Sequence, residues 1–543
     1  MKYAILDCYV DEPACLGVPP FIAPYGRSIY GALIDSGVAQ ENITFLTIDD
    51  LRLSEYKLID NYKMAFIFGG AVVPGRYLGA RIGTAAEMEK IFISNTKQRF
   101  AAGGPITTVL HQHDNVHATS QDIEYFAYNI AKGDTIEGRR SLEQLSKWNK
   151  AGSEIVKHHP WYPNIICEVE TSRGCPREHH CSFCSEGLFG AVEFRSNEDI
   201  LNEIKSLIDA GVTRIRLGRQ ADILQHGSLL NKYSQGFPQP NESYAIELFD
   251  ELKKIRQNGD LEILNIDNAN PGTITSYPEE SKRIIRAIAQ AVSPGDTMAL
   301  GVESFDPTVV AANNLKVAPE RVIDVIEIIN EAGCERVNGI PRLLPGINII
   351  HGLRGENKKT FEMNYKALLE IVEKDLLIKR INIRQLTPYP GTAMENSERT
   401  EGPLRKKFEY YRNKIRDDID IPLMEKIYPV GTIIEKSYIL DHNNEYSYGK
   451  EISSYAITAR FPEKIPIKTF IDALVIGHRE RSITTLPVGQ SINELSVASL
   501  RNIPGISKKG ADDIVLRRPF KTMEEAKPYL EYVTDELKNK LVI

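Results

Sequence analysis

A short segment, TSRGCPREHHCSFCSEG (171–187), holds three of the seven cysteines of this 543-residue chain within ten residues. They are Cys175, Cys181 and Cys184, with the spacing C-x5-C-x2-C. Clustered thiolates are soft ligands that favour zinc or an iron–sulfur cluster. The spacing predicts a metal centre rather than a disulfide framework, because three thiols are one too many for a single bridge.

The two metals make different demands on this loop. A closed zinc site needs a fourth ligand, which His179 or His180 could supply, although structural zinc sites more often consist of two paired half-sites. An iron–sulfur cubane held by three cysteines leaves one iron with an open position, where a substrate or cofactor can coordinate. The residues favour the iron–sulfur cluster and leave zinc as the alternative.

The composition excludes several other classes of protein. Seven cysteines, an odd and scattered number, do not form a disulfide framework in a chain of this size. The net charge of -7 opposes binding to nucleic acid through overall charge, which makes a nucleic-acid partner unlikely, although a local basic patch stays possible. The longest apolar run (64–73) is too short to cross a bilayer, and the N-terminus lacks the pattern of a signal peptide. We expect a cytoplasmic protein with no membrane contact.

Residues 1–150 alternate strand-like and helical patterns, which predicts a parallel sheet of a Rossmann-like α/β domain. Ligands of such open sheets bind at the carboxyl ends of the strands, which carry residues 11–20 and 69–79. The expected strands are 2–10, 43–49, 64–70 and 106–113.

Residues 151–425 repeat the same alternation with longer helices. The six units indicate a partial (β/α)6 barrel, whose chemistry would lie at the carboxyl ends of its strands. The cysteine loop follows the first of these strands and leads to a helix expected to begin near Asn197. The expected strands are 165–170, 214–218, 261–267, 297–303, 346–352 and 380–388.

The last part of the chain predicts two accessory modules. Short β runs in residues 426–487 are typical of a small β-barrel, similar to the TRAM type. In residues 488–543, two short helices joined at IPGIS (503–507) match a helix-hairpin-helix.

The cysteine loop resembles the cluster motif of the radical S-adenosylmethionine (SAM) enzymes, with the aromatic Phe183 just before Cys184. The usual first gap is three residues long, and here PREHH (176–180) has two more. The resemblance implies that the three cysteines hold a 4Fe–4S cluster whose open iron chelates SAM and cleaves it to a 5′-deoxyadenosyl radical. It also implies SAM contacts at the strand ends, where Gly218, Arg219 and Gln220 stand in place of the usual Gly-Gly-Glu. The complete set is Phe183, Gly218, Arg219, Gln220, Asn268, Glu303 and Ser304.

An α/β domain ahead of such a barrel resembles the cobalamin-binding domain of the cobalamin-dependent radical SAM methyltransferases. Residues 8–33 look like the first loop and helix of archaeal members that also end in a helix-hairpin-helix. The Asp-x-His-x-x-Gly signature of a lower cobalt ligand is absent, so the resemblance implies a weak or empty lower axial site. The implied cobalamin contacts are Leu16, Gly17, Val18, Pro19, Gly69, Gly70 and Val73.

The resemblance implies an enzyme, a C-methyltransferase that acts on an unactivated sp3 carbon and uses two SAM per turnover. The whole layout is similar to methanogen enzymes that methylate the Cα of a glutamine in methyl-coenzyme M reductase. This implies a protein or peptide substrate and an electron donor such as a ferredoxin or flavodoxin. No catalytic residue beyond the cluster ligands is assigned.

Two other functions stay open. A radical SAM tRNA methylthiotransferase also carries a small β-barrel, but it needs three N-terminal cysteines, and residues 1–150 contain only Cys8 and Cys15. The helix-hairpin-helix could also dock on nucleic acid. Residues 488–543 hold nine Lys and Arg against eight Asp and Glu, so docking on a protein is equally compatible.

Overall fold

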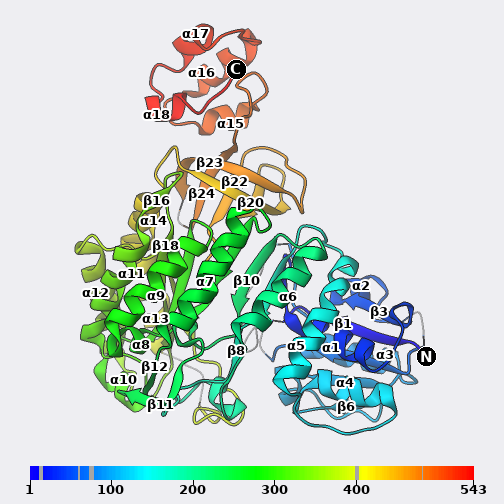
Figure 1. Ribbon diagram of the computed structural model, residues 1–543. Helices are drawn as coiled ribbons and strands as arrows, with labels where there is room; N and C mark the ends of the chain where they lie inside the picture. Colours follow the sequence, from blue (N-terminus) through cyan, green and yellow to red (C-terminus); the bar gives the residue numbers. More distant parts are fainter. Residues whose placement is uncertain (11–15, 59–60, 72–78, 398–402, 480) are drawn as a thin grey trace. The chain divides into compact units, whose positions relative to one another are not determined.

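The computed structural model describes the chain except for residues 11–15, 59–60, 72–78, 398–402 and 480 (Figure 1). The chain forms two compact units, which are described separately. The first consists of Met1–Pro176, Ser185–Asn231 and Ser243–Asp267, and the second of Arg177–Cys184, Lys232–Glu242 and Asn268–Ile543.

The first unit begins with a five-stranded parallel sheet in the order β3-β1-β4-β5-β6. After β1 the chain forms β3 on one side of β1 and then β4, β5 and β6 on the other side. The strand order therefore reverses between β1 and β4, which is where ligands bind in doubly wound sheets. The strands are β1 (Tyr3–Asp7), β3 (Ile43–Thr47), β4 (Met64–Phe68), β5 (Phe100–Gly103) and β6 (Val116–Ala118).

Helices cover both faces of this sheet, so its strand β1 is buried and, except for Asp7, apolar. In β1, Ala4 and Leu6 pack with α2 and α3, whereas Tyr3 and Ile5 pack with α1 and α4. All five β1 residues are buried, as expected for a parallel sheet enclosed on both faces. The helices are α1 (Pro24–Asp35), α2 (Ile48–Leu53), α3 (Ala85–Ser94), α4 (Ile123–Lys132) and α5 (Leu142–Ala151).

Three of the four strands expected in residues 1–150 are confirmed, and the fourth is wrong. Residues 106–113 form no strand; a 3-10 turn spans Pro105–Thr108, and the sheet uses Phe100–Gly103 instead. Gly104, with φ of 84°, and Pro105 end the strand before the β-branched residues begin. Of those residues, Ile106 is buried, whereas Thr108 and Val109 are exposed.

A second sheet of the first unit carries the cysteine-loop strand, in the order β13-β10-β7-β2. Its edge strand β2 comes from the N-terminal region and pairs in parallel with β7. The buried side chain of Arg27 in α1 also donates to the Glu168 carbonyl of β7 (2.6 Å), so the N-terminal region and this sheet share one unit. The strands and flanking helices are β2 (Phe21–Ile22), β7 (Ile166–Glu170), β10 (Arg214–Gly218), β13 (Ile263–Ile266), α6 (Asn197–Asp209) and α7 (Glu242–Gln257).

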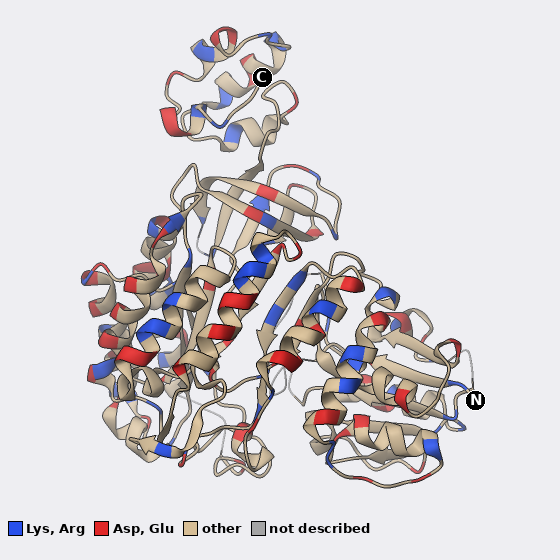
Figure 2. Ribbon diagram, viewed as in Figure 1, with Lys and Arg blue, Asp and Glu red and all other residues tan. Residues whose placement is uncertain are grey.

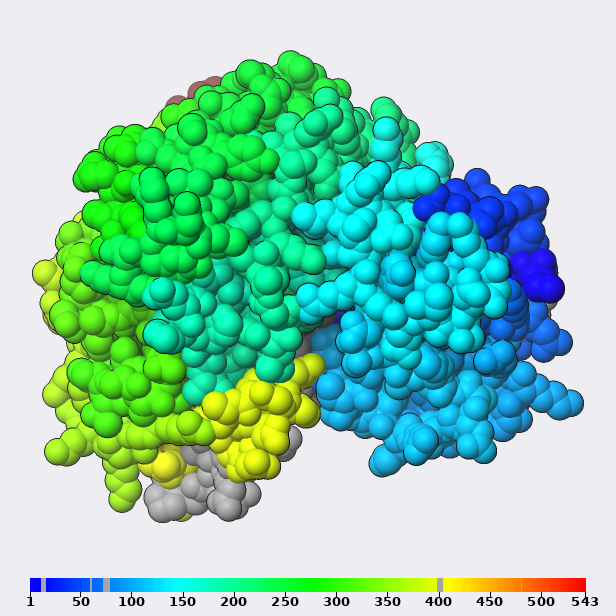
Figure 3. All heavy atoms as spheres, turned by 60° about the horizontal axis from the view of Figure 1, so that its bottom comes forward, coloured from blue at the N-terminus to red at the C-terminus, as the bar shows by residue number. Residues whose placement is uncertain are grey.

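The second unit contains a parallel sheet in the order β14-β15-β18-β19. All six strands expected in residues 151–425 are thus confirmed, three in each of the two sheets, while their closure into one barrel stays a prediction. The elements are β14 (Asn268–Ala269), β15 (Asp296–Glu303), β18 (Leu343–His351), β19 (Arg380–Gln385), α8 (Pro271–Ser276), α9 (Pro278–Ala291), α10 (Pro307–Ala312), α11 (Val322–Gly333), α12 (Lys358–Glu373), α13 (Pro403–Ile415) and α14 (Ile421–Ile427). Figure 3 shows the segment that follows β19, in yellow, at the molecular surface.

The expected small barrel is confirmed as a closed five-stranded barrel, in the order β20-β21-β22-β24-β23. It packs against the amino ends of β18 and β19, since Lys379 forms an ion pair with Glu451 and a Cβ on Gly346 would meet the Tyr455 ring. The carboxyl ends of β15, β18 and β19 lie at the opposite end of their sheet. The strands are β20 (Ile433–His442), β21 (Ser447–Lys450), β22 (Thr458–Phe461), β23 (Phe470–Arg479) and β24 (Ser482–Pro487).

Two helices, α15 (Val497–Asn502) and α16 (Lys508–Arg517), follow the barrel and are joined at Gly505, whose φ is 92°. Two further short helices, α17 (Met523–Ala526) and α18 (Asp535–Lys538), share their apolar core. The domain ranges expected above stay predictions. Among the described residues, no helix has the length and apolar character that crossing a membrane requires.

Candidate active site

The cysteine loop is tied to one segment of the second unit. The Ser182 amide donates to the Asn313 carbonyl (3.0 Å), and the Ser182 hydroxyl donates to Asn313 Oδ1 (2.7 Å). The Cys184 amide donates to the Cys181 carbonyl (3.2 Å), which turns the chain between the second and third cysteines. Cys181 is buried and Cys184 is half-buried; Cys175, also half-buried, belongs to the first unit.

Arg177 comes from the long first gap of the motif and reaches back to a predicted ligand atom. Its Nη1 lies 3.2 Å from Cys181 Sγ and donates to the Asn314 carbonyl (3.1 Å). Its guanidinium lies 4.9 Å from the ring centroid of Phe237. The enlarged first gap of the motif thus contains a cation, Arg177, that contacts the Cys181 sulfur.

A second cation, Lys316, lies between Glu303 and the cysteines. Its Nζ is 3.7 Å from Glu303 Oε1. Gly301 makes room for it, because a Cβ there would lie 2.0 Å from Lys316 Nζ. Burial lowers the pKa of Lys316, but attraction to Cys181, Glu303 and Cys184 outweighs this and raises the pKa overall. The site thus holds positive charge beside its sulfurs.

Glu303 ends β15 in a backbone conformation that side-chain-bearing residues seldom adopt, with φ of 67°. Burial raises its pKa to about 7, against the opposing effect of Lys316. Within the part of the chain that the structure describes, its buried Oε2 has no hydrogen-bond partner. A strained, buried residue with an unused acceptor at a strand end suits a ligand contact.

Apolar side chains pack around Cys181 and limit the access of water to it. Cys181 shares a buried cluster with residues of α10, of the loop after β18 and of the segment after β19, and Phe183 and Cys184 pack against it. The buried members are Cys181, Val309, Leu315, Leu353, Leu386 and Met394. Excluding water from these side chains lowers the local dielectric constant and so strengthens the electrostatic effect of nearby charges.

The other predicted SAM residues of the second unit have mixed surroundings. Ser304 is buried, and its hydroxyl accepts the Asp306 amide (3.1 Å) and lies 3.4 Å from Asn364 Oδ1. Asn268 begins β14 and pairs with Ala299. The Ser304 hydroxyl is therefore used in hydrogen bonds within the protein.

Gly218, Arg219 and Gln220 lie together at the end of β10 in the first unit. A Cβ on Gly218 would lie 2.3 Å from Glu168 Oε1. Arg219, with φ of 60°, is buried and paired with Glu186 (2.6 Å) and Tyr25 (3.2 Å). Gln220 donates to the Leu217 carbonyl (3.3 Å). These side chains are held by the protein's own groups.

The predicted cobalamin residues are also built into the protein interior. The Leu16 amide donates to Glu168 Oε2 (3.1 Å), and Gly17, Val18 and Pro19 are buried. Gly69 and Gly70 are buried too, and Val73 lies outside the described residues. A Cβ on Gly17 would lie 2.9 Å from Ala23 Cβ, and one on Gly69 would lie 2.5 Å from Met88 Cε. The glycines therefore serve close packing within the domain.

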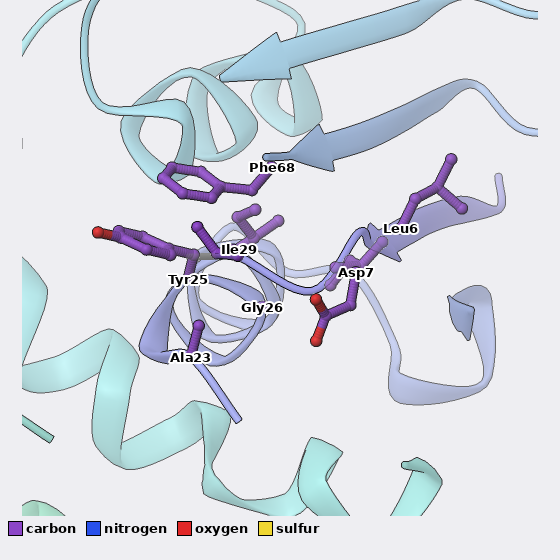
Figure 4. A pocket seen from close by; sticks show the side chains of 9 residues that line it. Leu6, Asp7, Ala23, Tyr25, Gly26, Ile29 and Phe68 are labelled. Carbon is purple, nitrogen blue, oxygen red and sulfur yellow. The ribbon is translucent and has the colours of Figure 1, made fainter. Parts of the chain in front are cut away.

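A small hollow lies where the strand order reverses, at the ends of β1 and β4 (Figure 4). The rings of Tyr25 and Phe68 stack there with centroids 3.5 Å apart. Asp7 closes the end of β1, accepts the Tyr9 amide (2.9 Å), and has its pKa raised to about 6 by burial. The cavity, about 10 Å³, is small, and its walls are mainly apolar.

The donor set fits the iron–sulfur cluster expected from the sequence. Three soft thiols on one loop are its usual ligands, and Arg177 and Lys316 offset the negative charge that such a cluster brings. In the described ranges, no three His, Cys, Asp or Glu side chains lie close enough together to hold one metal ion, and Cys175 belongs to a different unit from Cys181 and Cys184, so the fit rests on the type of ligand and its spacing in the chain.

The alternating α/β elements and the cysteine loop after β7 define a radical SAM domain, and residues 169–368 match the Radical SAM superfamily. Residues 169–368 therefore form a radical SAM domain, which implies a 4Fe–4S cluster and SAM as cofactors. An uncharacterized protein of Archaeoglobus fulgidus is 38% identical over 530 residues, covering 96% of each chain. One of Methanocaldococcus jannaschii is 36% identical and covers 88% of this chain and 92% of its own.

More distant similarities extend over parts of the chain. The tRNA-2-methylthio-N(6)-dimethylallyladenosine synthase of Corynebacterium efficiens is 23% identical, over 58% of this chain and 56% of its own. The radical SAM methyltransferase TsrM of Kitasatospora setae aligns with a TM-score of 0.49 and 13% identity, over 73% of this chain and 75% of its own. The cobalamin-dependent S-adenosylmethionine radical enzyme OxsB aligns with a TM-score of 0.47 and 14% identity, over 78% of this chain and 56% of its own.

Sequence reasoning missed the two cations and the residue that anchors the loop. Arg177 lies within the motif, and its presence in the enlarged gap was the available signal. Lys316 and Asn313 are more than 120 residues from the cysteines, in a segment without a recognisable motif. Only the folded chain brings them to the site.

Proposed function

We propose that the protein is a cobalamin-dependent radical SAM methyltransferase that methylates an unactivated sp3 carbon. The observation that carries the proposal is the combination of a radical SAM domain with a doubly wound N-terminal sheet. The order of that sheet reverses between β1 and β4, where doubly wound sheets bind their ligands. The hollow at this point, about 10 Å³, is too small to admit a corrin, so the proposal rests on the strand order and not on this cavity.

Each group of residues has a defined task in this proposal. Cys175, Cys181 and Cys184 hold the cluster, Arg177 and Lys316 set its electrostatic surroundings, and Glu303 offers an acceptor to SAM. When bound, the cluster and SAM would supply hydrogen abstraction, and cobalamin would supply the methyl group. The apolar cluster around Cys181 keeps water away from reactive species. In the N-terminal domain, we propose that the backbone of Leu16–Pro19 and of Gly69–Gly70 faces the corrin.

For the acceptor we propose the Cα of a glutamine in methyl-coenzyme M reductase, with a ferredoxin or flavodoxin as electron donor, in the cytoplasm. The support is the similarity of the overall layout noted above and the acidic net charge, which suits a protein substrate better than a bulk polyanion. One SAM is consumed in hydrogen abstraction and one in remethylating the cofactor.

A tRNA methylthiotransferase is the second candidate, favoured by the similarity to the Corynebacterium efficiens synthase. Such enzymes need a second cysteine triad. In residues 1–150 only Cys8 and Cys15 are available, and Cys8 is fully buried, with a pKa raised by that burial. This favours the methyltransferase.

The deciding experiment offers the anaerobic, reconstituted enzyme a glutamine-containing peptide of the reductase and, in parallel, bulk tRNA. We expect the peptide to gain the mass of one methylene, with one 5′-deoxyadenosine and one S-adenosylhomocysteine per product. Modified tRNA and an untouched peptide would refute the substrate and favour the second candidate. Separately, electron paramagnetic resonance of Co(II) cobalamin bound to the full-length protein should lack nitrogen superhyperfine splitting, and a protein that binds no corrinoid would remove the methyltransferase proposal.

A further inference from the structure

One face of β18 and β19 carries the apolar side chains that surround the cysteine loop. Ile350 of β18 packs against the buried cluster that contains Cys181, and Leu386, just after β19, is a member of that cluster. Residues two apart on a strand share a face, so Asn348 lies on the face of Ile350. Arg384 lies there too, because it is the neighbour of Ile350 in the strand pairing and precedes Leu386 by two residues. This surface is called the cluster face below.

A row of polar side chains, Asn348, Asn382 and Arg384, interrupts the apolar character of this sheet on the cluster face. Asn382 belongs to the row because it is the neighbour of Asn348 in the strand pairing. The opposite face of the same strands carries buried isoleucines instead: Ile347, Ile349 and Ile381. Parallel strands are normally apolar on both faces, and charged residues lie on the outer helices, as Figure 2 shows for α9 and α12. Folding alone does not require an arginine and two carboxamides here.

Hydrogen bonds connect this polar row and fix the direction of its side chains. Tyr455, from the loop between β21 and β22, donates its hydroxyl to Asn348 Oδ1 (2.7 Å). The carboxamide of Asn382 lies 3.1 Å from the same oxygen. With its own oxygen turned toward Arg384, Asn382 accepts from Nε (2.7 Å) and Nη2 (3.0 Å). The guanidinium of Arg384 is therefore oriented along one edge by Asn382.

The loop between β21 and β22 covers the amino end of the cluster face but leaves the polar row accessible. A Cβ on Gly346 would lie 2.2 Å from the Tyr455 ring, and Arg380 Nη1 donates to the Ala456 carbonyl (3.3 Å). The three residues of the row and Tyr455 are all half-buried, whereas every residue of the neighbouring strand β15 is buried. The row thus keeps accessible polar groups between the barrel loop and the apolar cluster around Cys181.

The chemistry of the row suits a ligand with a planar oxygen acceptor. A guanidinium keeps its charge and presents its donors in a fixed plane that matches a carbonyl or carboxylate group. The carboxamides of Asn348 and Asn382 both donate and accept hydrogen bonds. Within β18 and β19, the cluster face carries no acidic residue. Arg384 would therefore repel a cationic side chain, and an apolar one would leave its donors without a partner from the ligand.

We propose that Arg384, with Asn382 and Asn348, binds the side-chain carbonyl or carboxylate oxygen of the amino acid on which the radical acts. Two residues of strand, about 7 Å, separate Asn348 from Ile350, so an oxygen held on the row lies beside the apolar cluster around Cys181. Arg384 determines specificity, and Tyr455 is a positioning residue that acts through Asn348. The inference rests on the proposed function for an amino-acid substrate at this face and adds the chemical class of its side chain.

The test measures dissociation constants by ligand-observed NMR with the full-length, anaerobically reconstituted enzyme and SAM. The probes are the N-acetyl methylamides of glutamine, glutamate, norleucine and lysine. The wild type should bind the glutamine or the glutamate probe at least about tenfold more tightly than the norleucine and lysine probes, because only the first two offer an oxygen to the guanidinium. The tighter of the two oxygen-bearing probes identifies the group as a carboxamide or a carboxylate.

Variants separate recognition from structural support. Arg384→Met should weaken the favoured probe about tenfold and leave the norleucine probe unchanged, and Arg384→Lys should be intermediate, since it keeps the charge without the planar donors. Tyr455→Phe keeps the ring against Gly346 and should reduce the preference for glutamine over norleucine about threefold, whereas a purely structural role would weaken all probes equally. The matched control Arg405→Met removes an exposed arginine of α13 and should keep the wild-type values.

The inference is overturned if the wild type binds none of the probes, if it binds norleucine as tightly as glutamine and glutamate, or if Arg384→Met keeps the preference. It is also overturned if inorganic phosphate binds more tightly than both oxygen-bearing probes. Binding requires no turnover, so selective binding of the probes without methylation of the reductase peptide would refute the proposed function alone. Circular dichroism and iron content confirm that each variant is folded and loaded.

Discussion

Arg177 should raise the reduction potential of the cluster, and Arg177→Met tests this. Its Nη1 lies 3.2 Å from Cys181 Sγ, and the side chain is half-buried between Asn314 and Phe237. Reduction adds negative charge to the cluster, so a cation that hydrogen-bonds a ligand sulfur stabilises the reduced form more than the oxidised form. Methionine keeps an unbranched stem over the Phe237 ring and removes only the charge and the donors.

The size of the effect follows from the strength of that contact. A hydrogen bond to a charged group contributes about 1.5–3 kcal/mol, but a thiolate accepts it in both oxidation states. If a difference of about 1 kcal/mol separates the two states, a one-electron potential changes by about 40 mV, given about 59 mV for a tenfold change in equilibrium constant. We therefore expect the potential of Arg177→Met to be about 40 mV lower than that of the wild type.

The assay is an anaerobic redox titration of the reconstituted enzyme, followed by electron paramagnetic resonance of the reduced cluster. Arg177→Lys, which keeps the charge, should recover part of the shift. Arg321→Met, which breaks an exposed pair with Asp324, is the control and should not move the potential. An unchanged or higher potential in Arg177→Met, with full iron content, would refute the electrostatic role.

Three further outcomes are expected. Cys181→Ala should leave no stable cluster after reconstitution, measured as iron, sulfide and the broad absorbance; stoichiometric zinc in the wild type would contradict the assignment. Asp7→Asn should raise the free energy of unfolding at pH 7 by up to about 3 kcal/mol, because a carboxyl whose pKa rises from 3.8 to about 6 on folding stabilises the fold fully below pH 4 and loses that contribution as the pH rises through 6. Urea unfolding between pH 4 and 8 checks this, and equal pH slopes in both proteins would contradict it. Lys316→Met should weaken SAM binding at pH 7 about tenfold, since Glu303 loses the cation that opposes its protonation. Equilibrium dialysis at pH 7 and 9 measures the affinity for SAM. A variant with wild-type affinity at pH 7 would argue against the role of Glu303.

The cysteine loop and most of the strands could be predicted from the sequence because they depend on local properties. Thiol spacing within ten residues limits the metal chemistry, and short apolar runs between helical patterns indicate parallel strands. The same reasoning failed at residues 106–113, where a β-branched run looked like a strand. Phe100–Gly103 pair with β4 instead, and this pairing depends on the neighbouring strand rather than on the run itself.

Only the tertiary structure decided which distant groups meet. The approach of Lys316 to Glu303 requires the space left by Gly301, and the Lys379–Glu451 ion pair joins the amino end of β19 to the barrel. The predicted corrin-facing glycines likewise contact Ala23 and Met88. Such contacts join residues far apart in the chain, so they follow from sheet order and side-chain packing, which local patterns of hydrophobicity and charge do not encode.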